Sequence, residues 1–305
     1  MSEKIYELII VGAGPAGITA AVYAARKKLD FVIISQDIGG QAAWSGDIEN
    51  YTGYQFITGP ELALKFNEHM AAFGIDVVMP RLAQKIVKEG NIIRVTTEKT
   101  EYKARAVIIA TGKKPRELGI EGEKEFKNKG VTYCATCDGP LFRDKPVAII
   151  GGGNSGLDAA LQMMKISPKV YLINNTAELT GDRIMIEKLR QSTGVEVRNN
   201  TVVVRISGER FVNGIEVSQN SQVYHLSVKG VFVEIGLIPN SQCAAEVDKN
   251  TQGEIIVDCR NRTNVEGMFA AGDVTNVPEK QIIIACGEGS KACLAAFNYL
   301  ATHAA

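Results

Sequence analysis

Metal-binding residues are scarce in this sequence. Its three histidines, His69, His225 and His303, lie far apart, and only one of its cysteine pairs is closely spaced. A tetrahedral zinc site would need two further ligands beside such a pair, so we expect no metal. Six cysteines in 305 residues are also too few and too scattered for the disulfide framework of a small secreted domain.

An excess of charge of either sign is absent too. The chain has 34 Lys and Arg and 34 Asp and Glu, which gives a net charge of zero and a pI of about 6.8. Such a chain has no bulk field that would attract nucleic acid or an anionic membrane surface. We therefore predict no nucleic-acid partner and no membrane partner, and local basic patches for an acidic protein partner stay open.

No uninterrupted apolar run is long enough for a membrane span. The longest run, from Leu8 to Ala25, is broken by Gly12, Gly14, Pro15 and Gly17. It has neither a basic stretch before it nor a small-residue cleavage site after it, as a signal peptide would. We interpret it as a buried strand followed by a helix, and we predict a soluble, cytoplasmic protein.

The chain opens with a strand, a glycine-rich turn and a helix. Glu7–Val11 is a run of branched apolar residues typical of a central parallel strand, and a second strand is expected at Phe31–Ile34. Between them, Gly12–Gly17 has the pattern G-x-G-x-x-G, which suits a tight turn, close approach of a pyrophosphate, and helix–strand packing. This order predicts a dinucleotide site in preference to a turn that only packs. The acidic residue that usually ends the second strand is replaced by Ser35 and Gln36.

The same pattern recurs in the middle of the chain. Pro146–Ile150 predicts a buried strand, Gly151–Gly156 a glycine-rich turn, and Leu157–Lys165 a helix, which indicates an internal duplication. Two domains are also the natural expectation for this length. The polar segment Lys113–Lys129 is predicted to cross between them. Just before it, Val107–Gly112 reads as a buried strand whose carboxyl end should lie near a ligand.

The closely spaced cysteine pair, Cys134 and Cys137, lies directly upstream of the second glycine turn. Two cysteines at this spacing close a small ring on oxidation and reopen it by exchange. Asp138 follows at once, and a carboxylate there could give a proton to a departing thiol or take one from it. The alternatives are half of a metal site and a chance pair. The lack of further ligands and the adjacent nucleotide-type fold favour a redox-active dithiol.

The end of the chain is predicted to be helical. An apolar stretch, Lys280–Ala285, leads into a helix from about Gly287 to Ala301 with one buried face. The four cysteines outside the pair are expected to pack as small hydrophobic residues. They are Cys243, Cys259, Cys286 and Cys293.

With these motifs in place, the chain resembles the low-molecular-weight thioredoxin reductases and the flavoprotein half of alkyl hydroperoxide reductase. The motifs occur in the family's order over nearly the whole chain. They are Gly12–Gly17, Gly39-Gly-Gln41, Ala110-Thr-Gly112, Cys134-Ala-Thr-Cys-Asp138, Gly151–Gly156 and Phe269-Ala-Ala-Gly-Asp273. The segment Cys134–Asp138 is the most specific of them.

The resemblance implies an α/β fold with two Rossmann-like (three-layer ββα) dinucleotide-binding domains, the second inserted into the first. Residues 1–115 and 246–305 would form the FAD-binding domain. Residues 116–245 would form a pyridine-nucleotide-type domain that carries the dithiol. Members of the family are homodimers, and they alternate between two domain orientations, one presenting the dithiol to the flavin and the other exposing it.

Roles for single residues also follow from the resemblance. Cys137 would face the flavin, Cys134 would attack the partner disulfide, and Asp138 would be the acid/base. Asp273 would contact the ribityl chain. The full set of implied FAD contacts is Gly12, Gly14, Pro15, Ala16, Gly17, Ser35, Gln36, Gly39, Gly40, Gln41, Asn50, Ala110, Thr111, Gly112, Gly272, Asp273, Lys280, Gln281 and Ile282, of which the last two would lie near the isoalloxazine. The second turn, whose occupancy stays open, comprises Gly151, Gly153, Asn154, Ser155 and Gly156.

The sequence departs from the family where the electron donor should bind. NADPH-using reductases carry a basic cluster after the strand equivalent to Lys169–Ile173, and this cluster neutralises the 2′-phosphate. Here the stretch Asn174–Arg183 reads NNTAELTGDR and has no such cluster. The acidic residue expected for NAD is missing as well. Some relatives are reduced by ferredoxin, so we place NADPH below NADH and a ferredoxin-type donor level with NADH.

The sequence therefore predicts an FAD-dependent disulfide reductase, an enzyme that passes electrons from its donor through FAD to Cys134–Cys137 and on to thioredoxin or a similar dithiol protein. An alternative within the same chemistry is a peroxiredoxin system. Its flavoprotein has an amino-terminal thioredoxin-like domain, and because this sequence opens on the FAD unit we expect a separate thioredoxin-like partner. An alternative of another class is a redox-sensing flavin-binding protein without turnover.

Overall fold

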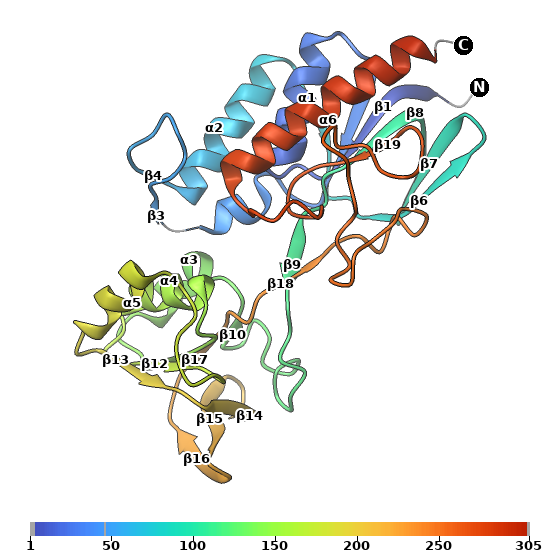
Figure 1. Ribbon diagram of the computed structural model, residues 1–305. Coiled ribbons are helices and arrows are strands. Elements are labelled where there is room, and N and C mark those ends of the chain that lie inside the picture. Colours follow the sequence, from blue (N-terminus) through green and yellow to red (C-terminus); the bar gives the residue numbers. More distant parts are fainter. Residues whose placement is uncertain (1–3, 46, 304–305) are drawn as a thin grey trace. The chain divides into compact units, whose positions relative to one another are not determined.

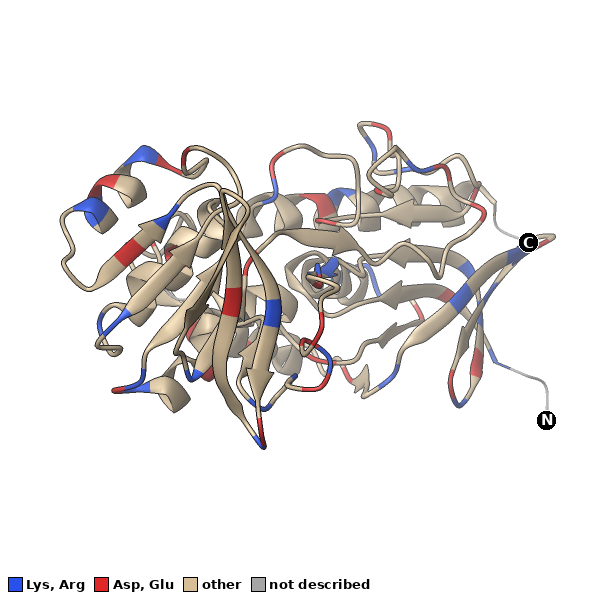
Figure 2. Ribbon diagram, turned by 90° about the horizontal axis from the view of Figure 1, so that it is seen from below, with Lys and Arg blue, Asp and Glu red and all other residues tan. Residues whose placement is uncertain are grey.

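The computed structural model describes residues 4–45 and 47–303, and for Trp44, Asp47 and Cys137 it describes the backbone alone (Figure 1). The chain forms two compact units. The first comprises Met1–Lys114 and Ile238–Ala305, and the second comprises Pro115–Leu237. Figure 2 shows basic and acidic residues interspersed over the elements of both units, as the zero net charge suggests.

The first unit is built on a seven-stranded sheet with the order β5-β2-β1-β8-β7-β6, and β19 also pairs with β8. Strands β2, β1, β8 and β19 are parallel, whereas β6, β7 and β8 form an antiparallel meander. The bounds are β1 Ile5–Val11, β2 Phe31–Ile34, β5 Val77–Val78, β6 Ala83–Glu89, β7 Ile92–Thr97, β8 Glu101–Ile109 and β19 Met268–Ala270. A small separate sheet pairs β3 Asp47–Ile48 with β4 Ile57–Thr58.

Helices cover one face of this sheet (Figure 1). They are α1 Pro15–Arg26, α2 Gly59–Ala72 and α6 Ile282–Thr302, and a 3-10 turn, η1, spans Gly40–Trp44. Alternate residues of β1 enter different cores, as a strand buried on both faces requires. Leu8 and Ile10 pack with α1 and α6, whereas Ile9 and Val11 pack toward β6, β7 and Ile255.

The second unit has the three layers expected of a nucleotide-binding domain. Its central parallel sheet has the order β10-β17-β11-β12-β13, one face packs on a three-stranded antiparallel sheet, β14-β15-β16, and the other packs on helices. The strands are β10 Val131–Thr132, β11 Val147–Ile150, β12 Val170–Ile173, β13 Val195–Arg198, β14 Thr201–Gly208, β15 Val212–Gln219, β16 Gln222–Leu226 and β17 Gly230–Val233. The helical segments are α3 Ala135–Asp138, η2 Gly139–Phe142, α4 Asn154–Met163 and α5 Arg183–Arg190.

The chain leaves the first unit along β9 Lys113–Pro115 and returns along β18 Leu237–Pro239, and these two strands pair. The first unit resumes at Ile238, earlier than residue 246, the boundary that the resemblance implies. The pairing with β9 gives the reason, because the returning strand already shares hydrogen bonds with the outgoing one. The contact between the two segments extends one residue further, since the backbone N–H of Asn240 donates to Gly112 O at 2.9 Å.

The last helix begins earlier than its sequence pattern indicated. We expected it from about Gly287, but α6 starts at Ile282, after the extended residue Gln281. Three consecutive isoleucines favour a strand by intrinsic preference. Tertiary packing makes this segment helical instead, because Ala285 and later residues of α6 bury one face in the core shared with α1.

Candidate functional site

The first glycine turn joins β1 to α1, and its three glycines face different surroundings. A Cβ on Gly12 (φ +107°) would lie 2.2 Å from Ala110 O, and one on Gly17 would lie 1.8 Å from Gly12 O. A Cβ on Gly14, the N-cap of α1, would meet nothing within 4 Å. Gly12 and Gly17 are therefore required by packing, whereas Gly14 leaves open space at the helix N-terminus, where a pyrophosphate is stabilised.

This difference predicts that two alanine substitutions separate folding from cofactor binding. Gly17→Ala should lower the free energy of unfolding by about 2 kcal/mol or more, because backbone atoms must move to admit the methyl group. Gly14→Ala should leave the stability of the flavin-free protein unchanged and weaken FAD binding roughly tenfold, about 1.4 kcal/mol. Urea unfolding of the flavin-free variants and titration with FAD measure both. Equal FAD affinity in Gly14→Ala and the parent protein would contradict the role of the open space.

The end of β2, next to this turn, presents no acidic side chain. Ser35 is buried, and its hydroxyl accepts a hydrogen bond from Ala13 N at 3.0 Å, so it holds the loop. Gln36 is exposed beyond it. Arg81, whose backbone N–H donates to Ser35 O at 2.8 Å, has a buried Nε with no partner among the described residues. No sequence pattern pointed to Arg81, whose guanidinium Nη1 donates to Pro80 O at 2.6 Å.

Side-chain hydrogen bonds also join residues that are distant in sequence. Asn50 Nδ2 donates to Gln281 Oε1 at 3.0 Å, and Gln41 Nε2 donates to Lys113 O at 3.2 Å. Gly39 (φ +94°) and Gly40 (φ +52°) open η1 beside the first turn, where a Cβ on Gly40 would lie 3.3 Å from Gly14 Cα. Thr111 is held by Asn240, since the Thr111 hydroxyl donates to Asn240 O at 2.7 Å.

Asp273, after β19, is the one acidic residue expected to contact the cofactor. It is half-buried, and no hydrogen bond to its carboxylate is recorded among the described residues. Burial raises the pKa of Asp273, and the ammonium groups of Lys280 and Lys113 oppose that rise. Its neighbour Gly272 is fixed instead by Glu288 of α6, whose carboxylate accepts Gly272 N at 2.9 Å. A half-buried carboxylate that the protein leaves free fits a ligand hydroxyl.

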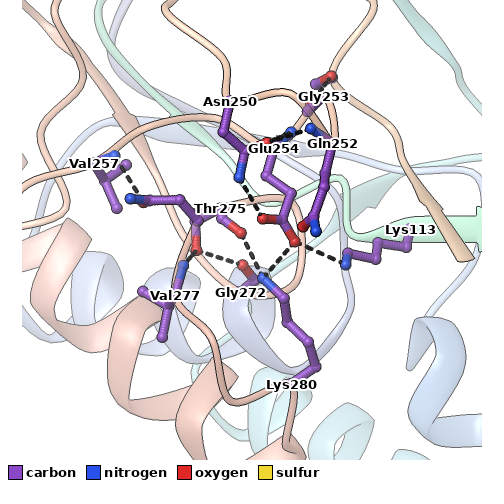
Figure 3. Close-up of polar contacts among 12 residues, drawn as sticks. Lys113, Asn250, Gln252, Gly253, Glu254, Val257, Gly272, Thr275, Val277 and Lys280 are labelled. Atoms are coloured by element: carbon purple, nitrogen blue, oxygen red, sulfur yellow. Dashed lines mark hydrogen bonds and ion pairs between the residues drawn. The ribbon is translucent and has the colours of Figure 1, made fainter.

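A buried charge network surrounds Glu254 (Figure 3). Glu254 is 6% exposed and accepts from Lys113 Nζ at 3.0 Å, Lys280 Nζ at 3.1 Å and Asn250 Nδ2 at 2.7 Å. These three donors lower the pKa of Glu254 to about 2, against the opposing effect of burial. Lys280 Nζ also donates to Thr275 O at 2.5 Å. Neither Glu254 nor Lys113 was predicted from the sequence, because an isolated charge in a loop or at the start of a short strand forms no pattern.

The second glycine turn, between β11 and α4, repeats the geometry of the first. A Cβ on Gly151 (φ +130°) would lie 2.1 Å from Glu234 O, and one on Gly156 would lie 1.9 Å from Gly151 O. The nearest atom to a Cβ on Gly153, the N-cap of α4, would be Thr180 Oγ1 at 3.9 Å. The space at the helix N-terminus is thus kept here as well. Asn154 closes one side, since its Oδ1 accepts Asp182 N at 2.7 Å.

The end of β12, where a ribose would be recognised, is occupied by the protein's own contacts. Asn174 is 2% exposed, and its amide donates to Thr176 O, Glu178 O and Asn199 Oδ1. The side chain of Asn174 is therefore unavailable to a ligand. Asn175 beside it is exposed and neutral, and Arg183, the nearest cation along this stretch, opens α5.

The dithiol segment follows β10 as the single helical turn α3. Cys134 is disulfide-bonded and half-buried. The backbone of Cys137 lies within α3, and its side chain lies outside the described part of the structure. Asp138 N donates to Cys134 O at 3.1 Å. The Asp138 carboxylate accepts a short hydrogen bond from the hydroxyl of Thr132, whose oxygen accepts Cys134 N at 3.2 Å.

A polar chain leads from the same turn to two half-buried acidic residues, Asp158 and Glu234. Thr136 Oγ1 donates to Gln162 Oε1 at 2.9 Å, and Gln162 Nε2 donates to Asp158 Oδ2 at 2.8 Å. Burial, together with the nearby charge of Asp158, raises the pKa of Glu234 to about 8. At neutral pH the Glu234 carboxyl is therefore mostly protonated, so it adds little negative charge beside the second glycine turn.

The four cysteines outside the dithiol are free. Cys243, Cys286 and Cys293 are buried, and burial raises the pKa of each thiol, so they remain protonated and unreactive. The prediction for Cys259 was wrong: it is exposed, because it lies in a polar turn between Asp258 and Arg262 rather than on an apolar face.

The described residues include neither a cluster of metal ligands nor a membrane-spanning helix. Within residues 4–45 and 47–303, no three His, Cys, Asp or Glu side chains gather closely enough to hold a metal ion. None of the helices in that part of the chain combines the length and the apolar character that crossing a bilayer requires.

Comparison with known proteins finds a family and close structural neighbours. Residues 6–289 match the family Pyridine nucleotide-disulphide oxidoreductase. The chain is 42% identical over 299 residues to an NADH dehydrogenase of Ferdinandcohnia aciditolerans, covering 97% of this chain and 57% of that protein. It is 41% identical over 303 residues to an Escherichia coli alkyl hydroperoxide reductase subunit, covering 97% and 58%. The chain thus spans under two thirds of the length of these relatives.

Solved structures match over nearly their full length. Lactococcus lactis thioredoxin reductase (FR conformation) has a TM-score of 0.92 at 31% identity, covering 97% of this chain and 99% of that one. A ferredoxin-flavin thioredoxin reductase from Clostridium acetobutylicum has a TM-score of 0.56 at 28% identity, covering 98% of each chain.

Fold, glycine turns and disulfide-bonded cysteine together define the class of flavoprotein disulfide oxidoreductases. The chain belongs to the pyridine nucleotide-disulphide oxidoreductase family. Membership implies the use of FAD and of a pyridine nucleotide, and the open space at Gly14 and the free carboxylate of Asp273 fit FAD in the first unit.

Proposed function

We propose that this protein is an FAD-dependent thioredoxin-disulfide reductase. The observation that carries the proposal is the dithiol turn: a disulfide-bonded Cys134 with Asp138 tied to it by two hydrogen-bonded links. A structural disulfide needs no such carboxylate, whereas a disulfide that opens and closes needs a group that handles protons. Thioredoxin, or a dithiol protein like it, is the proposed acceptor.

In the proposed reaction, bound FAD would supply the two-electron redox chemistry that reduces the disulfide. The chain's own residues bind and position it: Gly14 and the α1 N-terminus the pyrophosphate, Asp273 the ribityl hydroxyls, Asn50 and Gln281 the flavin end. We propose these roles, and those of the remaining predicted contacts, by the similarity to the family. The inserted arrangement, with FAD in the first unit and the dithiol in the second, is part of the same proposal.

For the electron donor we favour NADH or a reduced ferredoxin over NADPH. The second turn keeps space for a pyrophosphate at Gly153. Against a 2′-phosphate, the Asn174 side chain is held by hydrogen bonds within its own loop and Asn175 carries no charge, so neither side chain offers a cation to a phosphate dianion. A relative named NADH dehydrogenase and a neighbour titled ferredoxin-flavin thioredoxin reductase support the two favoured donors.

A peroxiredoxin system is the second proposal for the acceptor. It is supported by relatives named as alkyl hydroperoxide reductase subunits, of whose length this chain spans about three fifths or less. In that case a thioredoxin-like protein would carry electrons onward. A homodimer in the cytoplasm is the assembly and location that we propose with either acceptor. A redox sensor without turnover is the remaining alternative, and it differs by predicting no reduction of any protein disulfide.

An anaerobic titration of the FAD-loaded protein tests the donor. NADH or reduced ferredoxin should bleach the flavin stoichiometrically, and NADPH should be at least tenfold slower, a difference of about 1.4 kcal/mol or more in activation free energy. The reduced protein is then mixed with oxidised thioredoxin, and new thiols are counted. Rapid bleaching by NADPH refutes the donor assignment. No thiol formation after complete flavin reduction favours the sensor.

A further inference from the structure

The hydroxyl of Thr132 lies between the two groups that the reaction uses. Thr132 is the last residue of β10 and is 6% exposed. Its Oγ1 accepts the backbone N–H of Cys134 at 3.2 Å and donates to Asp138 Oδ2 in a short hydrogen bond. One buried hydroxyl thus connects the start of the dithiol turn with the carboxylate at its end.

The directions of these two hydrogen bonds follow from which atoms can donate. A backbone N–H can only donate, so Cys134 N occupies one lone pair of the Thr132 oxygen. The hydroxyl hydrogen must then point elsewhere, and an ionised carboxylate is an acceptor only, so the hydrogen points to Asp138. Hydrogen bonds to an ionised group are short and strong, which restrains the Asp138 side chain to one rotamer.

The pairing of β10 with β17 does not need this hydroxyl. Thr132 pairs with Phe232 of the parallel strand β17 through the backbone, and valine has nearly the same shape as threonine. The Asp138 backbone is held separately, because its N–H donates to Cys134 O at 3.1 Å. What the hydroxyl adds is the direction of the carboxylate relative to the dithiol.

We propose that Thr132 is a positioning residue for the acid/base Asp138. The inference rests on the proposed function and extends it. Thr132 holds Oδ2 of Asp138 and leaves Oδ1 to exchange a proton with the reacting sulfurs. Without the hydroxyl, the Asp138 carboxyl group is no longer held in this direction.

The step in which Asp138 acts is thiol–disulfide exchange with a protein disulfide. The Cys134 thiolate attacks one partner sulfur, a new S–S bond forms, and the partner's own S–S bond breaks. The departing partner sulfur takes up a proton, which Asp138 relays from the enzyme dithiol. Cys137 then attacks Cys134 and releases the partner's second thiol, so two electrons and two protons leave the enzyme dithiol, which ends as a disulfide.

The test compares Thr132→Val, which removes the hydroxyl, with Thr132→Ser, which keeps it. Each full-length protein is reduced with a small dithiol, freed of it, and alkylated with iodoacetamide across a range of pH, and modification at Cys134 is followed by peptide mass spectrometry. This readout needs no donor, flavin or protein partner. Thr136→Val is the matched control. It removes a hydroxyl from the same turn, but that hydroxyl donates to Gln162 of α4 and not to Asp138.

In Thr132→Val the midpoint of Cys134 alkylation should move to lower pH by about half a unit or more, because a released carboxylate no longer lies fixed near the thiol. Exchange of the reduced variant with a small symmetrical disulfide should slow roughly tenfold. Thr132→Ser should restore both, and Thr136→Val should keep the parent midpoint. A Thr132→Val profile that coincides with the parent's, or moves to higher pH, overturns the positioning role even if the parent protein reduces thioredoxin. If the shift appears but the parent reduces no protein disulfide, the positioning stands and the proposed function fails.

Discussion

A Cys134→Ser variant is expected to lose reduction of thioredoxin by roughly 10³-fold or more, since removing the nucleophile of a covalent mechanism leaves only the background rate. FAD should remain bound, because Cys134 belongs to the second unit and the residues proposed to hold FAD belong to the first. The donor should still reduce the flavin in this variant. Steady-state thioredoxin reduction and the flavin absorbance of the same sample measure the two effects separately.

Cys259→Ser is the matched control for this prediction. It makes the same chemical change at an exposed free cysteine of the first unit, and it should retain the parent activity. Full thioredoxin reduction by Cys134→Ser would remove the dithiol from the electron path. Loss of flavin from Cys134→Ser would instead show a structural effect of the substitution.

Much of the fold was predictable because it rests on local patterns. Continuous apolar strands, G-x-G-x-x-G turns and their helices are short-range signals, and β2 was placed correctly to the residue. The start of α6 was misplaced because isoleucine favours strands, and only the contact with α1 decides between the two states. Cys259 was misplaced because its exposure follows from a polar turn closed by hydrogen bonds between Asp258 and Arg262, which the residue type of Cys259 does not indicate.

In the candidate site, too, residues in local motifs were predictable and residues outside such motifs were not. Glycine turns and the cysteine pair have a characteristic spacing, so the sequence alone predicts Gly14, Gly153 and Cys134 as site residues. The polar residues that hydrogen-bond around these motifs have no characteristic spacing in the sequence. Thr132 lies at a strand end and Glu254 in a loop, and each acquires its role only when the chain folds and brings its partners within hydrogen-bond distance.

The network around Glu254 makes its pH dependence predictable. The pKa of Glu254 is lowered in the folded protein to about 2, below its usual value of about 4.5. A group with a lowered folded pKa stabilises the fold above its unfolded pKa, and that contribution disappears as the pH falls through the folded one. The contribution of Glu254 should therefore be complete above about pH 4.5 and lost between about pH 4.5 and about pH 2.

Replacing Glu254 with Gln should consequently destabilise the first unit by about 3 kcal/mol at pH 7, because two largely buried ammonium groups, Lys113 and Lys280, lose their shared carboxylate. Urea unfolding at a fixed, saturating FAD concentration measures this difference, which should shrink as the pH is lowered toward 2. The matched control is Glu68→Gln, which breaks the exposed pair with Lys65 and should cost less than about 1 kcal/mol. A Glu254→Gln variant as stable as Glu68→Gln at pH 7 would contradict the prediction. The expected result would mean that Glu254 holds in place the two cations, Lys113 and Lys280, that oppose the rise of the pKa of Asp273.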